Sequence, residues 1–269
     1  MSVVISLQSR AFDALSETQP ARKMAATEAL LSDWRADMWA GEDVSCFEPM
    51  TLDTPGHPAK PELISPREVP RRSLASGPGK AAFIHSITHI EFNATNLALD
   101  ALCRFSGMPR EYYADWLSVA ADEARHFSML SGRLLQLGYE YGDFPAHNGL
   151  WEMAQKTAHD VLQRMALVPR VLEARGLDVT PGMIKKLKGF GDEQSVAILE
   201  TILEEEIPHV AIGSRWFRYC CEQRGCEPES TFRALLNEHM VGRLKPPFNG
   251  PARLAAGFSA AELAALEAL

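Results

Sequence analysis

The sequence has few cysteines, and none of them has the spacing of a metal-binding or redox pair. Its five cysteines are an odd number and form no C-x-x-C pair within 269 residues. A disulfide framework needs paired cysteines, and a chain of this length can bury a sizeable apolar core without one. The sequence therefore predicts a cytoplasmic protein in a reducing compartment, without a disulfide scaffold or a structural zinc site.

Long hydrophobic runs and a surplus of positive charge are also missing. No apolar run approaches the roughly 18 residues that a membrane helix needs, and Arg10 and Asp13 interrupt the N-terminal stretch before a signal-peptide core could form. The 27 Lys and Arg residues are outnumbered by 35 Asp and Glu residues, which gives a formal net charge of −8. This balance disfavours general binding to nucleic acids or anionic membranes, and we expect no membrane partner.

Several catalytic signatures are absent as well. The sequence contains no Gly-rich phosphate loop, no Ser-His-Asp arrangement and no flavin, nicotinamide or iron–sulfur signature. Any redox chemistry would therefore need an external electron donor, such as a separate reductase.

The apolar residues that are present recur at helical spacing, and we find no convincing strand. The pattern predicts an all-α protein with a bundle of four long helices. These helical segments are expected over about residues 80–105, 110–137, 150–175 and 192–224.

Additional segments flank the predicted bundle. A helical stretch over about residues 7–40 and a proline-rich connector over about residues 43–78 come first. A helix over about residues 229–243, an extended KPPFNGPAR segment and a short helix from Ser259 come last. The expected domains are therefore an N-terminal part (1–78), the bundle (79–225) and a C-terminal helical extension (226–269).

Two prolines fall within or near these helices. In LDVTPGM, Thr180 and Pro181 fit an N-cap and the first residue of a new helix, which predicts a break in the chain there. Pro208 instead lies inside an apolar helical stretch, where it removes one backbone hydrogen bond. We expect the helix to continue through Pro208 with a kink or a π-bulge.

Acidic residues and histidines interrupt the apolar stripes of the four helices. The second and fourth helices each carry a Glu-x-x-His pair, and residues three apart lie on one helix face. The first and third helices each carry a lone glutamate, 32 and 33 residues before the pair that follows it. Two antiparallel hairpins would bring these six side chains together: Glu91, Glu123, His126, Glu173, Glu206 and His209.

Buried carboxylates repel one another, and this repulsion explains why a metal is expected. Two divalent cations would neutralise four glutamates, and two neutral imidazoles would add nitrogen ligands. Oxygen and nitrogen ligands without thiolates favour two iron ions, with manganese or a mixed iron–manganese pair as alternatives. Glu205 also lies near this face, and helical spacing alone does not choose between Glu205 and Glu206. The matching Glu123-x-x-His126 pair favours Glu206, which leaves Glu205 beside the ligands or in solvent.

Two more histidines lie on the first bundle helix. His89 is about 200° around the helix from Glu91, and His85 about 120° away and 9 Å along the axis. We expect both of them at the surface or packed against the N-terminal segment.

The order Glu, Glu-x-x-His, Glu, Glu-x-x-His resembles the ferritin-like di-iron carboxylate superfamily over about residues 80–224. Three stretches are similar to a narrower bacterial ferritin-like family without a firm function. They are EARGLDVTP (Glu173 to Pro181), EEIPHVAIG (Glu205 to Gly213) and KPPFN (Lys245 to Asn249). That family is often placed near the di-iron enzymes that hydroxylate a modified tRNA adenosine, so the resemblance implies a modified base as one kind of substrate.

Two functions fit such a site. The first is a di-iron oxidoreductase of the hydroxylase or oxygenase class, acting with O2 on a small molecule or a modified base. The second is a ferroxidase or iron-handling protein without an organic substrate. A cage-forming subunit needs little beyond the bundle, whereas the long additions here could roof a substrate pocket or mediate a homodimer. Their length therefore favours the oxygenase.

Overall fold

The computed structural model describes residues 5–70, 72–240 and 244–268. The chain divides into two compact units, Met1–Trp151 and Glu152–Leu269, and helix α5 (Gly149–Lys156) spans the boundary between them. Within the described residues the regular secondary structure is helical, and β pairing is limited to one isolated bridge between Leu63 and Ala146. The prediction of an all-α protein is confirmed, and such a structure is consistent with a ferritin-like bundle.

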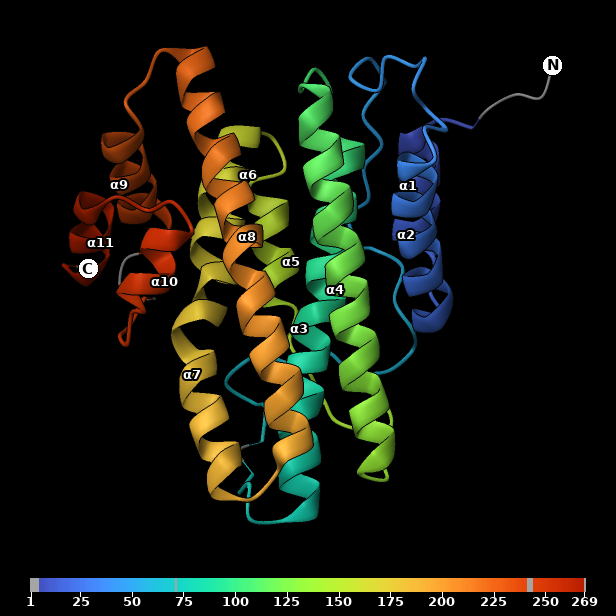
Figure 1. Cartoon of the computed structure of the whole chain (residues 1–269), viewed down its shortest axis with the longest axis vertical. Coiled ribbons are helices and arrows are strands. Elements are labelled where there is room, and N and C mark those ends of the chain that lie inside the picture. The colour runs from blue at the N-terminus through green and yellow to red at the C-terminus, as the bar shows by residue number, and fades with distance from the viewer. Residues whose placement is uncertain (1–4, 71, 241–243, 269) are drawn as a thin grey trace. The chain divides into compact units, whose positions relative to one another are not determined.

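The first unit is built around two long helices that pack along each other as a hairpin (Figure 1). Ser76 caps the first of them by accepting a hydrogen bond from the backbone N–H of Gly79, and the loop before the second is only five residues long. Two shorter helices pack on this hairpin, α1 against α3 and α2 against α4. The helices are α1 (Leu7–Ser16), α2 (Pro20–Arg35), α3 (Gly77–Arg104) and α4 (Arg110–Gln136).

The proline-rich connector between α2 and α3 contains no helix in its described residues, as expected. It is fixed to its own unit by backbone hydrogen bonds, among them Met50 N–H to the carbonyl of Cys103 and Gly56 N–H to the carbonyl of Leu15. The indole N–H of Trp151 donates to the carbonyl of Asp53 at 2.8 Å. The connector therefore covers part of α3.

The second unit contains a long helix, α8, against which α6 and α7 pack, and three short helices that follow it. A π-helical segment, η1, joins α6 to α7. The elements are α6 (Val161–Leu167), η1 (Val168–Glu173), α7 (Ala174–Gly189), α8 (Glu193–Arg224), α9 (Pro228–His239), α10 (Gly250–Ala255) and α11 (Ala260–Glu267).

Three of the four long helical segments lie where the sequence predicts them, and the third does not. In place of one helix over 150–175 the chain forms α5, a turn, α6 and η1, and it then continues as α7 through Pro181. The predicted break at LDVTPGM is therefore wrong. A proline leaves the carbonyl four residues earlier without its helical partner, and here the Asn249 side chain donates to that carbonyl, on Leu177, at 3.1 Å.

At the second proline, helix α8 continues through Pro208 as expected. It is α-helical there, so of the two expected distortions the π-bulge is absent and the kink stays a prediction; the π-helical segment lies at Val168–Glu173. Near the C-terminus, the expected helix over 229–243 ends at His239, and residues 241–243 lie outside the described residues. The KPPFNGPAR segment is not wholly extended, because α10 begins at Gly250.

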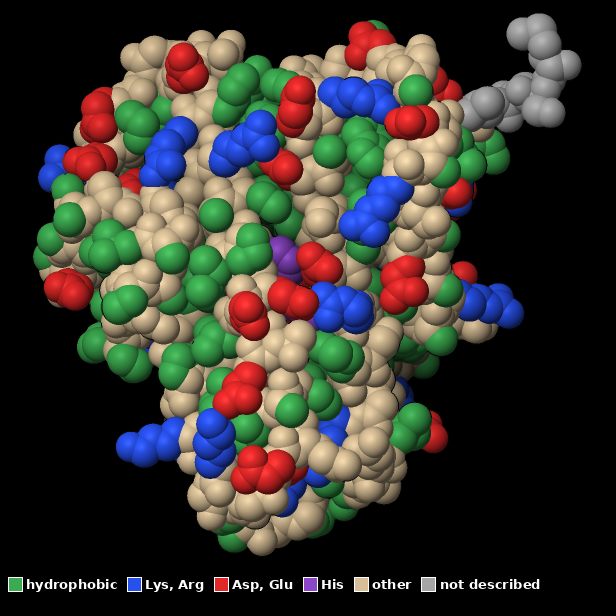
Figure 2. All heavy atoms as spheres, in the orientation of Figure 1, with side chains coloured by type: hydrophobic (Ala, Val, Ile, Leu, Met, Phe, Trp, Pro, Cys, Tyr) green, Lys and Arg blue, Asp and Glu red, His purple; other side chains and the backbone are tan. Residues whose placement is uncertain are grey.

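The surface carries charges of both signs. On the face drawn in Figure 2, acidic and basic side chains are interspersed rather than gathered into patches of one sign. Among the described residues, none of the helices is both long enough and apolar enough to cross a membrane.

Candidate metal centre

Helix α3 supplies the first candidate ligand. Nearly every side chain from Glu91 to Cys103 is buried, because α4 packs on one side of this helix and α1 on another. Glu91 retains only 4% of its exposed area. A buried carboxylate is costly unless positive charge or hydrogen bonds compensate it, so its neighbours determine what it can do.

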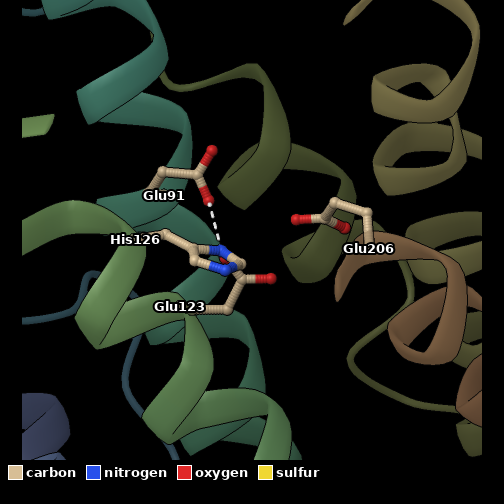
Figure 3. A group of neighbouring side chains, drawn as sticks. All are labelled: Glu91, Glu123, His126 and Glu206. Atoms are coloured by element: carbon tan, nitrogen blue, oxygen red, sulfur yellow. Dashed lines mark ion pairs between the residues drawn. The ribbon is translucent and has the colours of Figure 1, made fainter. Parts of the chain in front are cut away.

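Helix α4 supplies two more candidate ligands on one face. Glu123 and His126 are three residues apart, and both are buried, at 1% and 0% exposed. The His126 Nδ1 atom lies 3.5 Å from Oε2 of Glu123 and 3.6 Å from Oε2 of Glu91. Two carboxylates therefore converge on one imidazole nitrogen (Figure 3).

The two carboxylates change the pKa of His126. Burial alone would lower the pKa of the imidazole, but the carboxylates of Glu123 and Glu91 outweigh burial and raise the pKa of His126 to about 11. The two carboxylates thus favour a positive charge between them, which a protonated imidazole would provide. A divalent cation would supply the same charge and would accept oxygen and nitrogen donors.

These three side chains form a buried group within the first unit. Such a group of carboxylates and an imidazole could hold a metal ion.

In the second unit the same spacing recurs on α8. Glu206 and His209 are both buried, at 8% and 2% exposed, and His209 Nδ1 lies 3.8 Å from Oε2 of Glu206. Glu205 is half-buried and Glu204 is exposed. Of the two glutamates that helical spacing could not separate, Glu206 is the buried one.

The other three predicted ligands, Glu173, Glu206 and His209, lie in the second unit. His209 is buried on α8, whereas Glu173 is half-buried and is the last residue of the π-helical segment η1. A π-helix contains an extra residue in a turn, so the direction of a side chain at its end does not follow from α-helical spacing. The periodicity of the sequence could not have fixed the direction of Glu173 for this reason.

The other face of α3 carries polar side chains for which the sequence predicted no role. His89 Nδ1 lies 2.8 Å from the hydroxyl oxygen of Tyr141, and His85 Nε2 accepts a hydrogen bond from the backbone N–H of Gly142 at 2.9 Å. Both histidines are buried, which lowers the pKa of each to about 4. Of the two positions expected for them, the surface is therefore wrong, because the loop after α4 covers both histidines; packing against the N-terminal segment stays a prediction.

A buried lysine belongs to this second face as well. The Lys23 ammonium, from α2, donates to Oδ1 of Asn96 at 2.6 Å and to the carbonyl of Leu15 at 2.7 Å. Burial lowers the pKa of Lys23 to about 7. In the sequence Lys23 is only one polar residue within a predicted helical stretch. Its burial could not be predicted, because helical periodicity does not reveal which face of a helix another helix covers.

The chain is similar to known protein sequences along most of its length. The model of a family described as "Protein of unknown function (DUF455)" matches residues 16–264. The chain belongs to this family. A Haemophilus influenzae protein described as "Uncharacterized protein" is 49% identical over 213 residues, which are 77% of this chain and 74% of that protein. No solved structure matches the chain.

Proposed function

We propose that the buried carboxylate and imidazole side chains hold two iron ions, and that the protein uses them to oxidise an organic substrate with O2. The observation that carries this proposal is the convergence of Glu91 and Glu123 on Nδ1 of His126, with all three side chains buried. Two buried carboxylates around one imidazole provide a donor set suited to iron or manganese. The same Glu-x-x-His spacing on α8 supports a second set of ligands.

Each ligand has a distinct task in this proposal. Glu91, Glu123 and His126 would hold metal from the first unit, and Glu206, His209 and Glu173 would complete the site from the second. Bound iron would supply the redox chemistry that O2 activation requires. The surrounding apolar helices would exclude water from the reacting groups.

The chain must obtain electrons from elsewhere under this proposal. Its sequence has no flavin, nicotinamide or iron–sulfur signature, so a separate reductase would have to supply them. The proposed substrate is a small organic molecule or a modified nucleic-acid base, the latter by resemblance alone.

The experiment that tests this function is O2 consumption after anaerobic loading with Fe(II). With a chemical reductant and excess O2, an oxygenase site continues to reduce O2 well beyond one equivalent per site. A protein that only oxidises and stores iron consumes O2 in proportion to added Fe(II) and accumulates ferric mineral in a large assembly. Size-exclusion chromatography with iron detection separates the two, and a mineral-containing cage would refute the oxygenase proposal.

The Glu123→Ala variant supplies the negative control, because it removes one of the two carboxylates beside His126. Glu204→Ala is the matched variant, since Glu204 is exposed on the helix that carries Glu206. We expect Glu123→Ala to abolish O2 consumption and Glu204→Ala to retain it. Equal activity of the two variants would argue against this site.

A further inference from the structure

The π-helical segment η1 is the least regular part of the second unit. It covers six residues, Val168–Glu173, between two α-helical stretches. Such segments are rare and less favourable than α-helix, so neighbouring groups must hold them, and they often occur at functional sites. Glu173, one of the proposed metal ligands, is the last residue of this segment.

An arginine within η1 is anchored to the C-terminal helix. Arg170 is 1% exposed, and its Nη2 donates to Oε1 of Glu262 at 2.7 Å, while its Nε donates to the hydroxyl of Ser214 at 3.2 Å. Three aromatic rings lie 4.2–4.7 Å from the centre of its guanidinium: Phe217, Phe232 and Phe258. The middle of η1 is therefore fixed from outside its own helix.

A second anchor lies just after η1, on α7. Asp178 is buried and accepts two hydrogen bonds from the guanidinium of Arg253, at 2.9 and 2.7 Å, and one from the backbone N–H of Asn249 at 2.9 Å. Arg175 donates to the carbonyls of Lys245 and Pro247. Residues 245–262, which we call the C-terminal strap, thus bind the chain on both sides of Glu173.

The strap also explains why α7 can continue through Pro181. The carbonyl of Leu177 loses its helical donor because Pro181 has no N–H, and the side chain of Asn249 donates to it instead. The KPPFN motif, which ends at Asn249, therefore makes its contacts with the EARGLDVTP motif that contains Glu173. These two motifs therefore pack against each other, although 64 residues separate Pro181 from Lys245.

On its other side, η1 packs closely against α8. A Cβ atom at Gly213 would lie 2.4 Å from the Cβ of Pro169, so only glycine allows this approach. The segment is thus held between α8 and the strap, and its backbone has little freedom to change register.

We propose that the C-terminal strap is a positioning element that keeps η1 π-helical and so sets the direction of Glu173. Arg170 and Asp178 are the positioning residues through which it acts. Each residue of an α-helix turns by about 100°, so relaxation of η1 to α-helix would rotate one of its flanks by that angle. Glu173 would then point away from its present direction. This inference rests on the proposed metal site, to which it assigns a supporting segment.

The test removes the anchor while it keeps the packing. In the Arg170→Met/Glu262→Met variant, apolar side chains replace a buried ion pair, a change that cores often tolerate. Leu235→Ala is the matched control, because Leu235 is buried on α9 and lies outside the strap. Leu235→Ala should lower the free energy of unfolding, measured by urea unfolding, while the Arg170–Glu262 ion pair stays intact.

Two readouts decide the outcome. Hydrogen exchange of residues 168–173 should rise at least tenfold in the double variant relative to Leu235→Ala. Bound Fe(II) should fall from two to one per chain, and the visible spectrum of bound Co(II) should change, with neither effect in Leu235→Ala. Unchanged exchange would overturn the role of the strap, and two bound irons with an unchanged spectrum would overturn the positioning of Glu173.

A milder variant covers the case in which the double variant does not fold. Asn249→Ala removes the donor to Leu177 and should raise exchange in η1 and the first turns of α7; wild-type exchange would contradict the proposal. If the wild-type chain binds no iron, the proposed function fails. Exchange at residues 168–173 then still decides whether the strap holds η1.

Discussion

The buried Lys23 makes the stability of the protein depend on pH in a specific direction. Its ammonium is buried and donates hydrogen bonds to two neutral oxygens, on Asn96 and Leu15. Burial lowers its pKa from 10.5 in the unfolded chain to about 7 in the folded protein. Between these two values the unfolded chain binds one more proton than the folded protein. The free energy of unfolding therefore rises with pH across this window.

The size of this effect follows from proton linkage. One extra proton bound by the unfolded state changes the free energy of unfolding by about 1.4 kcal/mol per pH unit. Near pH 7 the folded lysine is half protonated, so the slope starts at about half that value. From pH 7 to pH 9 we expect Lys23 to contribute a gain of about 2 kcal/mol.

The Lys23→Met variant isolates this contribution. It leaves the oxygens of Asn96 and Leu15 without their donor, which costs about 1–3 kcal/mol for each buried group. That cost does not depend on pH. The titration of Lys23 is therefore tested by the slope of the free energy of unfolding against pH, and not by the free energy of unfolding at one pH. Urea unfolding of both proteins at pH 7, 8 and 9, followed by far-ultraviolet circular dichroism, measures the two slopes.

The control is Lys186→Met, which removes the same charge from an exposed position on α7. We expect Lys186→Met to follow the wild-type slope, and Lys23→Met to lose about 2 kcal/mol of the gain between pH 7 and 9. Parallel curves for wild type and Lys23→Met would refute the argument from burial.

Three further predictions concern other parts of the structure. Burial lowers the pKa of His85 to about 4, so His85 should contribute a loss of about 2 kcal/mol in the free energy of unfolding as the pH falls from 6.5 to 4. His85→Gln, which can still accept from Gly142, should reduce the decline measured by urea unfolding by that amount, and a decline equal to that of the wild type would contradict the prediction. Gly213→Ala should lose about 1–3 kcal/mol through contact with Pro169, whereas Gly182→Ala, with open space around it, should lose nothing in the same assay. Removal of iron by a chelator should lower the melting temperature in calorimetry, because bound metal stabilises the folded state, and an unchanged value would argue against a bound metal.

Much of the helical framework was predictable, because long apolar stripes with a period of 3.6 residues determine where helices run. The bounds of α3, α4 and α8 lie within three residues of the prediction. The candidate ligands on α4 and α8 could be found because a glutamate and a histidine three residues apart interrupt a buried apolar stripe, and Glu91 on α3 because a single acidic residue does so. This pattern is local in the sequence, so it can be recognised without knowledge of the tertiary structure.

The π-helical segment and the continuous α7 could not be predicted in this way. Pro181 is a stop signal when its neighbours alone are considered, and it is accommodated only because Asn249 donates to the carbonyl of Leu177. The burial of His85 and Lys23 likewise depends on which segments cover the second face of α3. Contacts between residues distant in sequence determine these features, and the helical periodicity of a sequence does not predict such contacts.

The central claim is that the buried carboxylates and imidazole bind iron. Its most direct test is the iron content of the protein after anaerobic loading with Fe(II) and removal of unbound metal. We predict two irons per chain for the wild type and for Glu204→Ala, and loss of stoichiometric binding for Glu123→Ala. Wild-type protein that retains no more iron than Glu123→Ala would contradict the claim.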